Sequence, residues 1–175
     1  MSASIVLTTF GSLGDIHPYV ALALGLRGRG HRVAIATGEF YRGKIEALGI
    51  GFHPVRPNVS LEDRELIAFM MDVRKGPERV LRSMVFPALR ESYEDLLAAA
   101  RGADLLVSHV LTFAAPVIAE VLGLRWASVT LAPMSFFSAF DPPVLTPYPA
   151  LARLRALGPG VNRRILELGK RSVLP

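Results

Sequence analysis

The sequence predicts an α/β fold whose mostly parallel sheet is doubly wound. Three observations support this prediction. Short apolar runs typical of buried strands alternate along the chain with patterns typical of helices. Such alternation indicates a parallel sheet covered on both faces. The first apolar run also ends in a turn with two glycines that leads into a helix, a place where ligands bind.

The first third of the chain predicts three strands and two helices. Glycines follow both helical patterns, at positions where glycine commonly ends a helix. In chain order, the expected elements are a strand at 5–7, a helix at 19–26, a strand at 32–37, a helix at 40–48 and a strand at 51–55.

The middle of the chain predicts two successive helices, at 61–73 and 78–101, separated by a Gly-Pro pair. Pro87 lies inside the second helix. Because proline removes one backbone hydrogen bond, we expect this helix to kink near Ser83, one turn earlier.

The last part of the chain returns to the doubly wound pattern and then departs from it. The expected elements are a strand at 104–108, a helix at 112–122, a strand at 126–131 and basic helices at 151–157 and 161–173. An irregular segment at 134–149 is rich in aromatic residues and prolines. Apolar groups on irregular backbone favour a pocket wall or an interface.

Composition limits the class of protein. The 175 residues are enough for one domain with a substantial core, and 51% of them are hydrophobic, with a mean hydropathy of +0.37. No apolar run reaches the roughly 18 residues of a membrane span, and no secretory signal opens the sequence. The absence of cysteine excludes disulfides and thiolate metal sites. We expect a cytoplasmic protein without a transmembrane segment.

The net charge of +5 comes from one end of the sequence. Residues 153–175 hold six Lys and Arg against one acidic residue, an excess equal to the whole net charge. The remainder shows no basic stripe with interleaved aromatic residues, as a nucleic-acid-binding face requires. A solvated or partner-facing tail helix explains the charge better than a nucleic-acid partner does.

The segment at 9–18 contains the glycine turn and the start of the first helix. Backbone N–H groups at a helix start have no helical partners, the helix dipole is positive there, and glycine permits close approach of a ligand. Asp15 lies in this turn, where its carboxylate can cap the helix or act on a bound molecule.

Binding of a nicotinamide dinucleotide is one alternative for this turn. The fingerprint of such sites requires G-x-G-x-x-G and an acidic residue at the end of the second strand. Here Gly11 and Gly14 have no third glycine in register, and Glu39 lies slightly beyond the second strand. A Walker loop is absent, since no Gly-Lys-Ser/Thr sequence occurs. The dinucleotide fingerprint is therefore only half present.

Three stretches resemble a known family. The segment Gly11-Ser12-Leu13-Gly14-Asp15-Ile16-His17-Pro18, continuing to Ala23 and into the stretch 29–33, is similar to the opening of GT-B-fold glycosyltransferases, above all the sterol, antibiotic and flavonoid glucosyltransferases. The stretches 48–52 and 119–124 match their third strand and a later helix end, although Arg125 replaces the usual proline. The resemblance covers roughly residues 4–135.

The resemblance implies an inverting O-glycosyltransferase that uses a nucleotide sugar, UDP- or dTDP-linked, without a required metal or other cofactor. Residues 1–150 would form the N-terminal acceptor-binding domain, and residues 151–175 would lead toward an absent C-terminal domain that binds the donor. The acceptor would be a hydrophobic small molecule with a hydroxyl group. We expect the chain to be inactive without its C-terminal domain, and its exposed interdomain face to be a candidate for self-association.

The resemblance also assigns roles within the first motif. Asp15 occupies the position of the family's catalytic base, and an N-cap role for it is compatible with that. His17 is the rival base, but residues two apart on a helix point about 200° apart, so only one of the two faces the reacting centre. Ser12, with Gly14, is expected to meet a donor phosphate, and an ordinary turn serine is the alternative.

A wall for the acceptor is expected from aromatic and methionine side chains, which suit a flat apolar molecule. The candidates for acceptor binding are Phe10, His17, Met70, Met71, His109, Phe113, Met134, Phe136 and Phe137. Several of them could instead belong to the core. A non-catalytic module that binds an apolar ligand is the remaining alternative, because the same side chains would serve it.

The histidines other than His17 leave one question open. In plant relatives a strand-end aspartate orients a histidine base, and here that position holds His109. His109 is expected either to border the acceptor or to be a surface histidine. His31 and His53 are expected to be structural, and four scattered histidines make no metal site.

Overall fold

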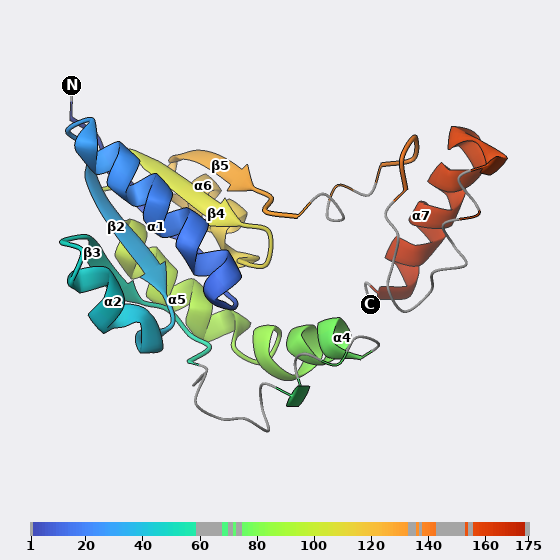
Figure 1. Cartoon of the computed structure of the whole chain (residues 1–175), viewed down its shortest axis with the longest axis horizontal. Coiled ribbons are helices and arrows are strands. Elements are labelled where there is room, and N and C mark those ends of the chain that lie inside the picture. The colour runs from blue at the N-terminus through green and yellow to red at the C-terminus, as the bar shows by residue number, and fades with distance from the viewer. Residues whose placement is uncertain are drawn as a thin grey trace. The chain divides into compact units, whose positions relative to one another are not determined.

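The computed structural model describes residues 2–58, 68–69, 72, 75–132, 136, 138–142, 153 and 156–173. The chain divides into two compact units, Met1–Val129 and Thr130–Pro175 (Figure 1). The first unit contains the sheet. The division expected from the sequence, into an acceptor-binding domain at 1–150 and a helical tail at 151–175, stays a prediction.

The first unit is built on a five-stranded parallel sheet with the strand order β3-β2-β1-β4-β5. The strands are β1 (Ser4–Thr8), β2 (Arg32–Thr37), β3 (Gly51–Pro54), β4 (Leu105–His109) and β5 (Arg125–Val129). The chain winds outward from the central β1 through β2 and β3, then returns to the other side of β1 for β4 and β5. The predicted doubly wound α/β fold is therefore confirmed.

Helices cover both faces of this sheet. Helix α1 (Leu13–Gly28) lies in front of the sheet in Figure 1, whereas α5 (Leu89–Ala100) and α6 (Ala114–Leu122) lie behind it. Gly123 ends α6 with a positive φ of 63°, as the glycine pattern predicted. The single helix expected at 40–48 is instead a 3₁₀ turn followed by the short α2 (Arg42–Glu46).

The core lies on both sides of the sheet because successive strand residues point to opposite faces. Val6 and Leu106 are paired across β1 and β4 and pack in a cluster with Leu96 of α5 and Ile118 of α6. The next residue of β1, Leu7, is fully buried on the opposite face, the one that α1 covers. Burial on both faces explains why these strands are apolar at consecutive positions.

The helix expected at 78–101 is interrupted, and this is a correction. It consists of α4 (Gly76–Val80), a π-helical turn at Leu81–Val85, and α5, which begins only at Leu89. Pro87 has no N–H, and the N–H of Phe86 donates to the carbonyl of Leu81, five residues back, over 2.9 Å. In place of the predicted kink, the chain forms a π-helical turn and then leaves the helix until α5 begins.

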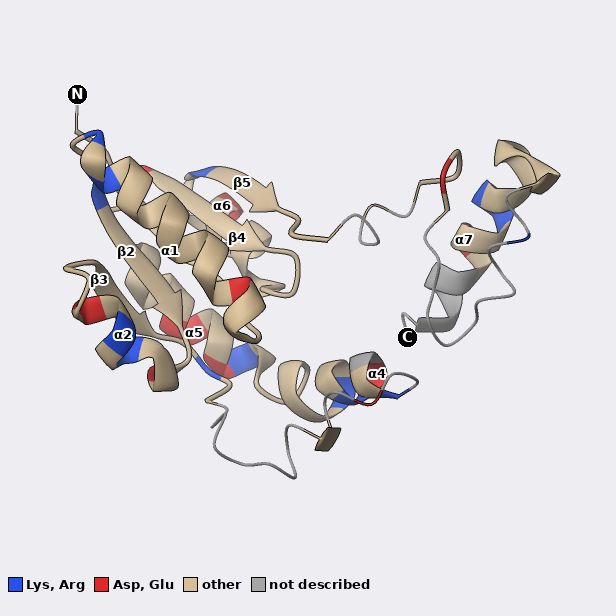
Figure 2. Cartoon of the chain, in the orientation of Figure 1, with Lys and Arg blue, Asp and Glu red and all other residues tan. Residues whose placement is uncertain are grey.

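Charged side chains of both signs are interspersed on the first unit (Figure 2). Arg42 pairs with Glu39 and Glu46, and Arg56 pairs with Asp95 through two nitrogen–oxygen contacts of 2.8 Å. The second unit contains α7 (Pro159–Val173), which agrees with the helix expected at 161–173. The elements expected at 61–73, 134–149 and 151–157 lie mostly outside the described residues.

Candidate active site

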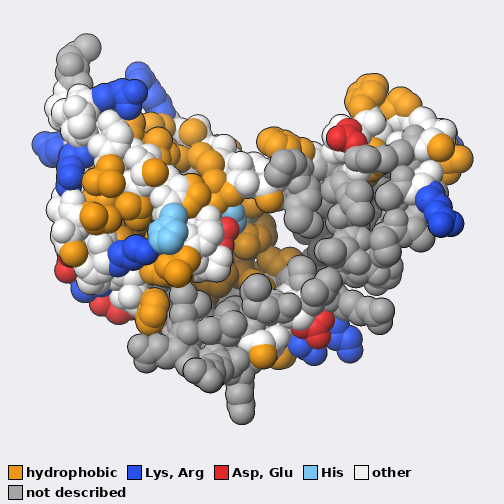
Figure 3. Space-filling model, in the orientation of Figure 1, with side chains coloured by type: hydrophobic (Ala, Val, Ile, Leu, Met, Phe, Trp, Pro, Cys, Tyr) orange, Lys and Arg blue, Asp and Glu red, His pale blue; other side chains and the backbone are white. Residues whose placement is uncertain are grey.

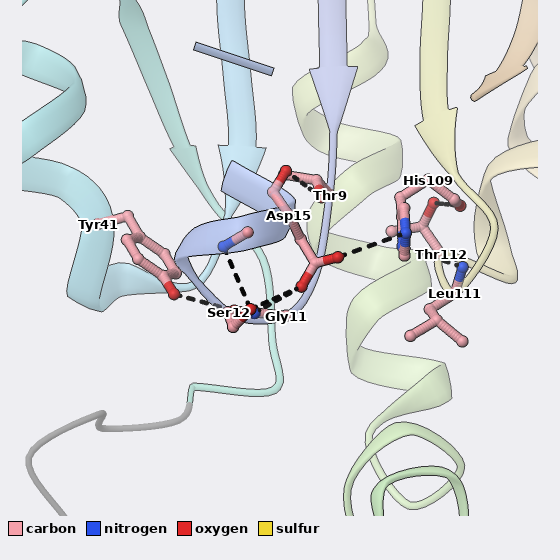
Figure 4. Close-up of polar contacts among 9 residues, drawn as sticks. Thr9, Gly11, Ser12, Asp15, Tyr41, His109, Leu111 and Thr112 are labelled. Atoms are coloured by element: carbon pink, nitrogen blue, oxygen red, sulfur yellow. Dashed lines mark hydrogen bonds and ion pairs between the residues drawn. The ribbon is translucent and has the colours of Figure 1, made fainter. Parts of the chain in front are cut away.

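The centre of the sheet offers a place for a ligand. β1 lies between β2 and β4, so the connections that leave β1 and β4 run toward opposite edges of the sheet. A crevice outside the carboxyl ends of the strands at such a switch point is where open α/β sheets bind ligands. The turns that follow β1 and β4 meet here, and Figure 4 shows their side chains.

Helix α1 begins at Leu13, six residues before the helix start that its apolar pattern predicted. Ser12 is the N-cap: its N–H donates to Oδ2 of Asp15 over 2.8 Å, and its Oγ accepts from the N–H of Gly14 over 3.2 Å. This reciprocal capping box satisfies N–H groups that have no helical partner. Pro18 lies inside the helix, where it removes only one hydrogen bond.

Gly11 allows the carboxylate of Asp15 to fold back over the turn. Its φ is +137°, a conformation that side chains rarely adopt, and an added Cβ would lie 2.7 Å from Cγ of Asp15. The carbonyl of Gly11 accepts a hydrogen bond of 2.9 Å from the hydroxyl of Tyr41. Glycine is therefore required here both for the backbone and for the position of the carboxylate.

The two oxygens of Asp15 have different surroundings (Figure 4). Oδ2 accepts from the backbone N–H of Ser12 and from its hydroxyl, the latter over 3.2 Å. Oδ1 faces Nε2 of His109 at 3.8 Å, which is longer than a hydrogen bond. The Asp15 side chain is 29% exposed. Oδ2 therefore serves the helix cap, whereas the contact described for Oδ1 is the long one to His109.

His109, the last residue of β4, is 6% exposed, and its interpretation as a surface histidine is wrong. Its Nδ1 accepts from the N–H of Leu111 over 3.4 Å, and Tyr19 of α1 packs edge-on against its ring, with 6.4 Å between the centroids. Burial lowers the pKa of the His109 imidazole, and the charge of Asp15 only partly opposes this shift. The lowered pKa favours the neutral imidazole at pH 7.

An apolar pocket lies beside the same two turns. Phe10 from the turn after β1 and Phe113 from the turn after β4 line it, together with residues of α5. Its volume of about 30 Å³ is far below the several hundred Å³ of pockets that enclose a small molecule. The described side chains thus form part of a wall and do not by themselves enclose an acceptor.

Comparison with known proteins decides the family. Residues 5–125 match the Glycosyltransferase family 28 N-terminal domain. The chain belongs to glycosyltransferase family 28. It is 31% identical over 151 residues to a sterol 3-beta-glucosyltransferase of Candida albicans, and these residues span 78% of the chain and 10% of the relative. It is 36% identical over 115 residues to an O-mycaminosyltylonolide 6-deoxyallosyltransferase of Streptomyces fradiae, spanning 62% and 26%.

Solved structures agree on the fold of the family 28 chain. The glycosyltransferase SnogD from Streptomyces nogalater superimposes with a TM-score of 0.57 at 23% identity, over 95% of this chain and 41% of that one. SsfS6 from Streptomyces sp. SF2575, complexed with thymidine diphosphate, gives 0.53 at 20% identity, over 87% and 43%. The resemblance read from the opening motif is confirmed, and the chain spans less than half of these proteins.

The family 28 chain separates the two candidate bases as the helix geometry predicted. His17 is exposed, and its Nε2 lies 2.5 Å from the ammonium of Lys44 on α2. Asp15 instead faces His109 on β4. Contact of His17 with an acceptor stays a prediction, and so does contact of Ser12 and Gly14 with a donor phosphate, since both of these residues serve the helix cap.

The remaining predicted residues are only partly described. Phe136 is 69% exposed and belongs to the second unit. His31 accepts from the N–H of Ala3 over 3.2 Å, in line with the structural role expected of it. The candidates that lie outside the described residues are Met70, Met71, Met134 and Phe137.

Three residues that support Asp15 were not predicted as site residues. Gly11 was part of the motif, but its contact with the carboxylate was not foreseen. Tyr41 comes from the segment after β2, and Tyr19 lies one turn after Asp15 on α1. Burial raises the pKa of each hydroxyl, and the charge of Asp15 raises it further. Only the spacing of Tyr19, four residues after Asp15 on one helix face, was a signal in the sequence.

Two features are absent from the part of the chain that the structure describes. No group of three or more His, Asp or Glu side chains there is placed to hold a metal ion. No helix among the described residues is long and apolar enough to cross a membrane.

Proposed function

We propose that this chain is the acceptor-binding part of an inverting, metal-independent O-glycosyltransferase, in which Asp15 is the catalytic base. The observation that supports the proposal most strongly is that the two carboxylate oxygens of Asp15 make different contacts. Oδ2 is held by the helix cap, whereas Oδ1 faces His109 at the switch point of the sheet, beyond hydrogen-bond distance, on a side chain that is 29% exposed. A general base must reach the proton it removes, within about 3 Å.

The proposed reaction forms one bond and breaks another at the anomeric carbon. The acceptor oxygen attacks this carbon from the side opposite the leaving group, which inverts its configuration. The bond from the anomeric carbon to the phosphate oxygen breaks, and its electron pair leaves with the nucleoside diphosphate. The hydroxyl proton passes to Oδ1 of Asp15 as the hydroxyl becomes acidic in the transition state.

The donor and acceptor classes follow from the relatives. The C. albicans relative is a sterol glucosyltransferase and the S. fradiae relative acts on a tylonolide, so a hydrophobic acceptor with a hydroxyl group is proposed. The thymidine diphosphate bound to SsfS6 supports a nucleotide sugar as donor. Phe10 and Phe113 would contact the acceptor.

The dinucleotide alternative fits the helix start poorly. A pyrophosphate would need the free N–H groups at the start of α1. Here the N–H of Ser12 and that of Gly14 are already bonded within the capping box, and the carboxylate of Asp15 lies over the same turn.

To test the proposal, this chain is fused to the part of the S. fradiae transferase that follows the region aligned with this chain. We expect this fusion to transfer sugar from a dTDP- or UDP-sugar to a hydroxylated polyketide or sterol, measured by mass spectrometry. The chain alone should show no transfer, and NADH should cause no thermal shift. The intact S. fradiae enzyme is the positive control. Tight acceptor binding without transfer by the fusion would contradict the proposal and favour a binding module.

A further inference from the structure

We propose that His109 is a positioning residue for Asp15: a neutral imidazole whose Nε2–H is directed at Oδ1 of the carboxylate and fixes its orientation when the acceptor binds. The inference rests on the proposed function of Asp15 and adds a second group to the site. Three features of the structure support it: the direction of the ring, its burial, and the different exposure of the His109 and Asp15 side chains.

The direction of the imidazole follows from its hydrogen bonds. Nδ1 accepts from the N–H of Leu111, so in the neutral ring the proton lies on Nε2. Nε2 is the nitrogen that faces Oδ1 of Asp15 (Figure 4). The ring thus presents a donor to the one oxygen that the helix cap does not hold. The distance of 3.8 Å must shorten for a hydrogen bond to form, as polar contacts in ligand-free sites commonly do once the reactants bind.

Burial holds the ring in place and favours its neutral form. The His109 side chain is 7% exposed, Tyr19 packs edge-on against it, and Thr112 donates to its backbone carbonyl over 2.6 Å. The phenol of Tyr19 is itself buried, and no hydrogen-bond partner is present for it among the described residues. With Asp15 as the neighbouring charge, a neutral donor supports the carboxylate without forming a buried ion pair.

The contacts and the exposure of the two side chains indicate that Asp15, and not His109, meets the acceptor. His109 has one nitrogen bonded to the backbone and the other directed at Asp15, so neither is free to take a proton from an acceptor. The side chain of Asp15 is 29% exposed, whereas that of His109 is 7% exposed. The carboxylate is therefore the group that meets the acceptor, and the imidazole acts only through it.

The first test measures the protonation of His109 in the 175-residue chain by nitrogen-15 NMR at pH 7. We expect the neutral form with its proton on Nε2. A proton on Nδ1, or a doubly protonated ring, would overturn the proposal. This measurement needs no transfer activity, so it stands apart from the test of the proposed function.

The second test compares two variants in the fusion protein. His109→Leu removes the donor and should lower kcat by roughly 10- to 100-fold, the effect of a misplaced reacting group, with KM changed less than twofold. His109→Gln places an amide N–H near the position of Nε2 and should recover most of kcat. Thermal unfolding of both variants identifies a loss that arises from misfolding, and a Leu variant as active as the parent would refute the positioning role.

Combination with Asp15→Asn separates the two proposals. If His109 acts only through the carboxylate, His109→Leu should cause no further loss once Asp15 is Asn. Equal and independent losses would overturn the positioning role and leave Asp15 as the base. Full activity of Asp15→Asn itself would instead refute the proposed function.

Discussion

Asp15→Asn should reduce sugar transfer by the fusion about 10²- to 10⁴-fold, the usual contribution of a general base. Asparagine keeps an oxygen that can accept from the N–H of Ser12, so the helix cap and the fold should survive. What is lost is the capacity of the second oxygen to take a proton. The measurement is kcat at saturating donor and acceptor, with a thermal unfolding curve for each variant.

Asp104→Asn is the matched control for this substitution. Oδ2 of Asp104 accepts from the N–H of Ser4 over 2.7 Å, so it too binds a backbone amide. Asp104 immediately precedes β4, at the opposite end of the strand from His109. We expect its variant to transfer sugar at the parental rate. If both variants lost activity equally, the loss would reflect the fold and not a base.

Gly11→Ala should disrupt the site by displacing the carboxylate. The added Cβ would lie 2.7 Å from Cγ of Asp15 and closer still to Oδ2, while the φ of +137° strains any residue other than glycine. We expect a loss of about 1–3 kcal/mol in the free energy of unfolding and a loss of transfer of at least the order of 10²-fold. Chemical denaturation and the transfer assay measure the two effects.

Gly30→Ala provides the comparison for Gly11→Ala. Gly30 also has a positive φ, +85°, but a Cβ there would meet nothing within 4 Å. This variant should show only the backbone strain, about 1 kcal/mol, with transfer unchanged. Unchanged transfer by Gly11→Ala would mean that the position of the carboxylate is not needed for the reaction.

Much of the fold was predictable because the three central strands β1, β2 and β4 are largely buried. Runs such as the one around Leu7 are apolar at consecutive positions, and each expected strand lies within two residues of its prediction. The start of α1 was not predictable from apolar spacing, because Ser12 and Asp15 fix it through the capping box. Likewise Pro87 predicted a kink, but a pattern of residue types does not distinguish a bend from a π-helical turn.

Within the candidate site, the sequence motif singled out Asp15 but did not predict which residues contact it. The partners of its carboxylate come from β4 and from the segment after β2. His109 follows an apolar strand and looked as suited to the surface as to the crevice. Its burial depends on Tyr19 and on the pairing of β4 with β1, which are tertiary contacts.

A crystal structure of the fusion with an acceptor and an unreactive donor analogue would test the central claim most directly. We predict that the reacting hydroxyl lies within about 3 Å of Oδ1 of Asp15, the reach of a general base. An acceptor bound with that hydroxyl nearer to His17, or far from both side chains, would contradict the assignment of Asp15 as the base.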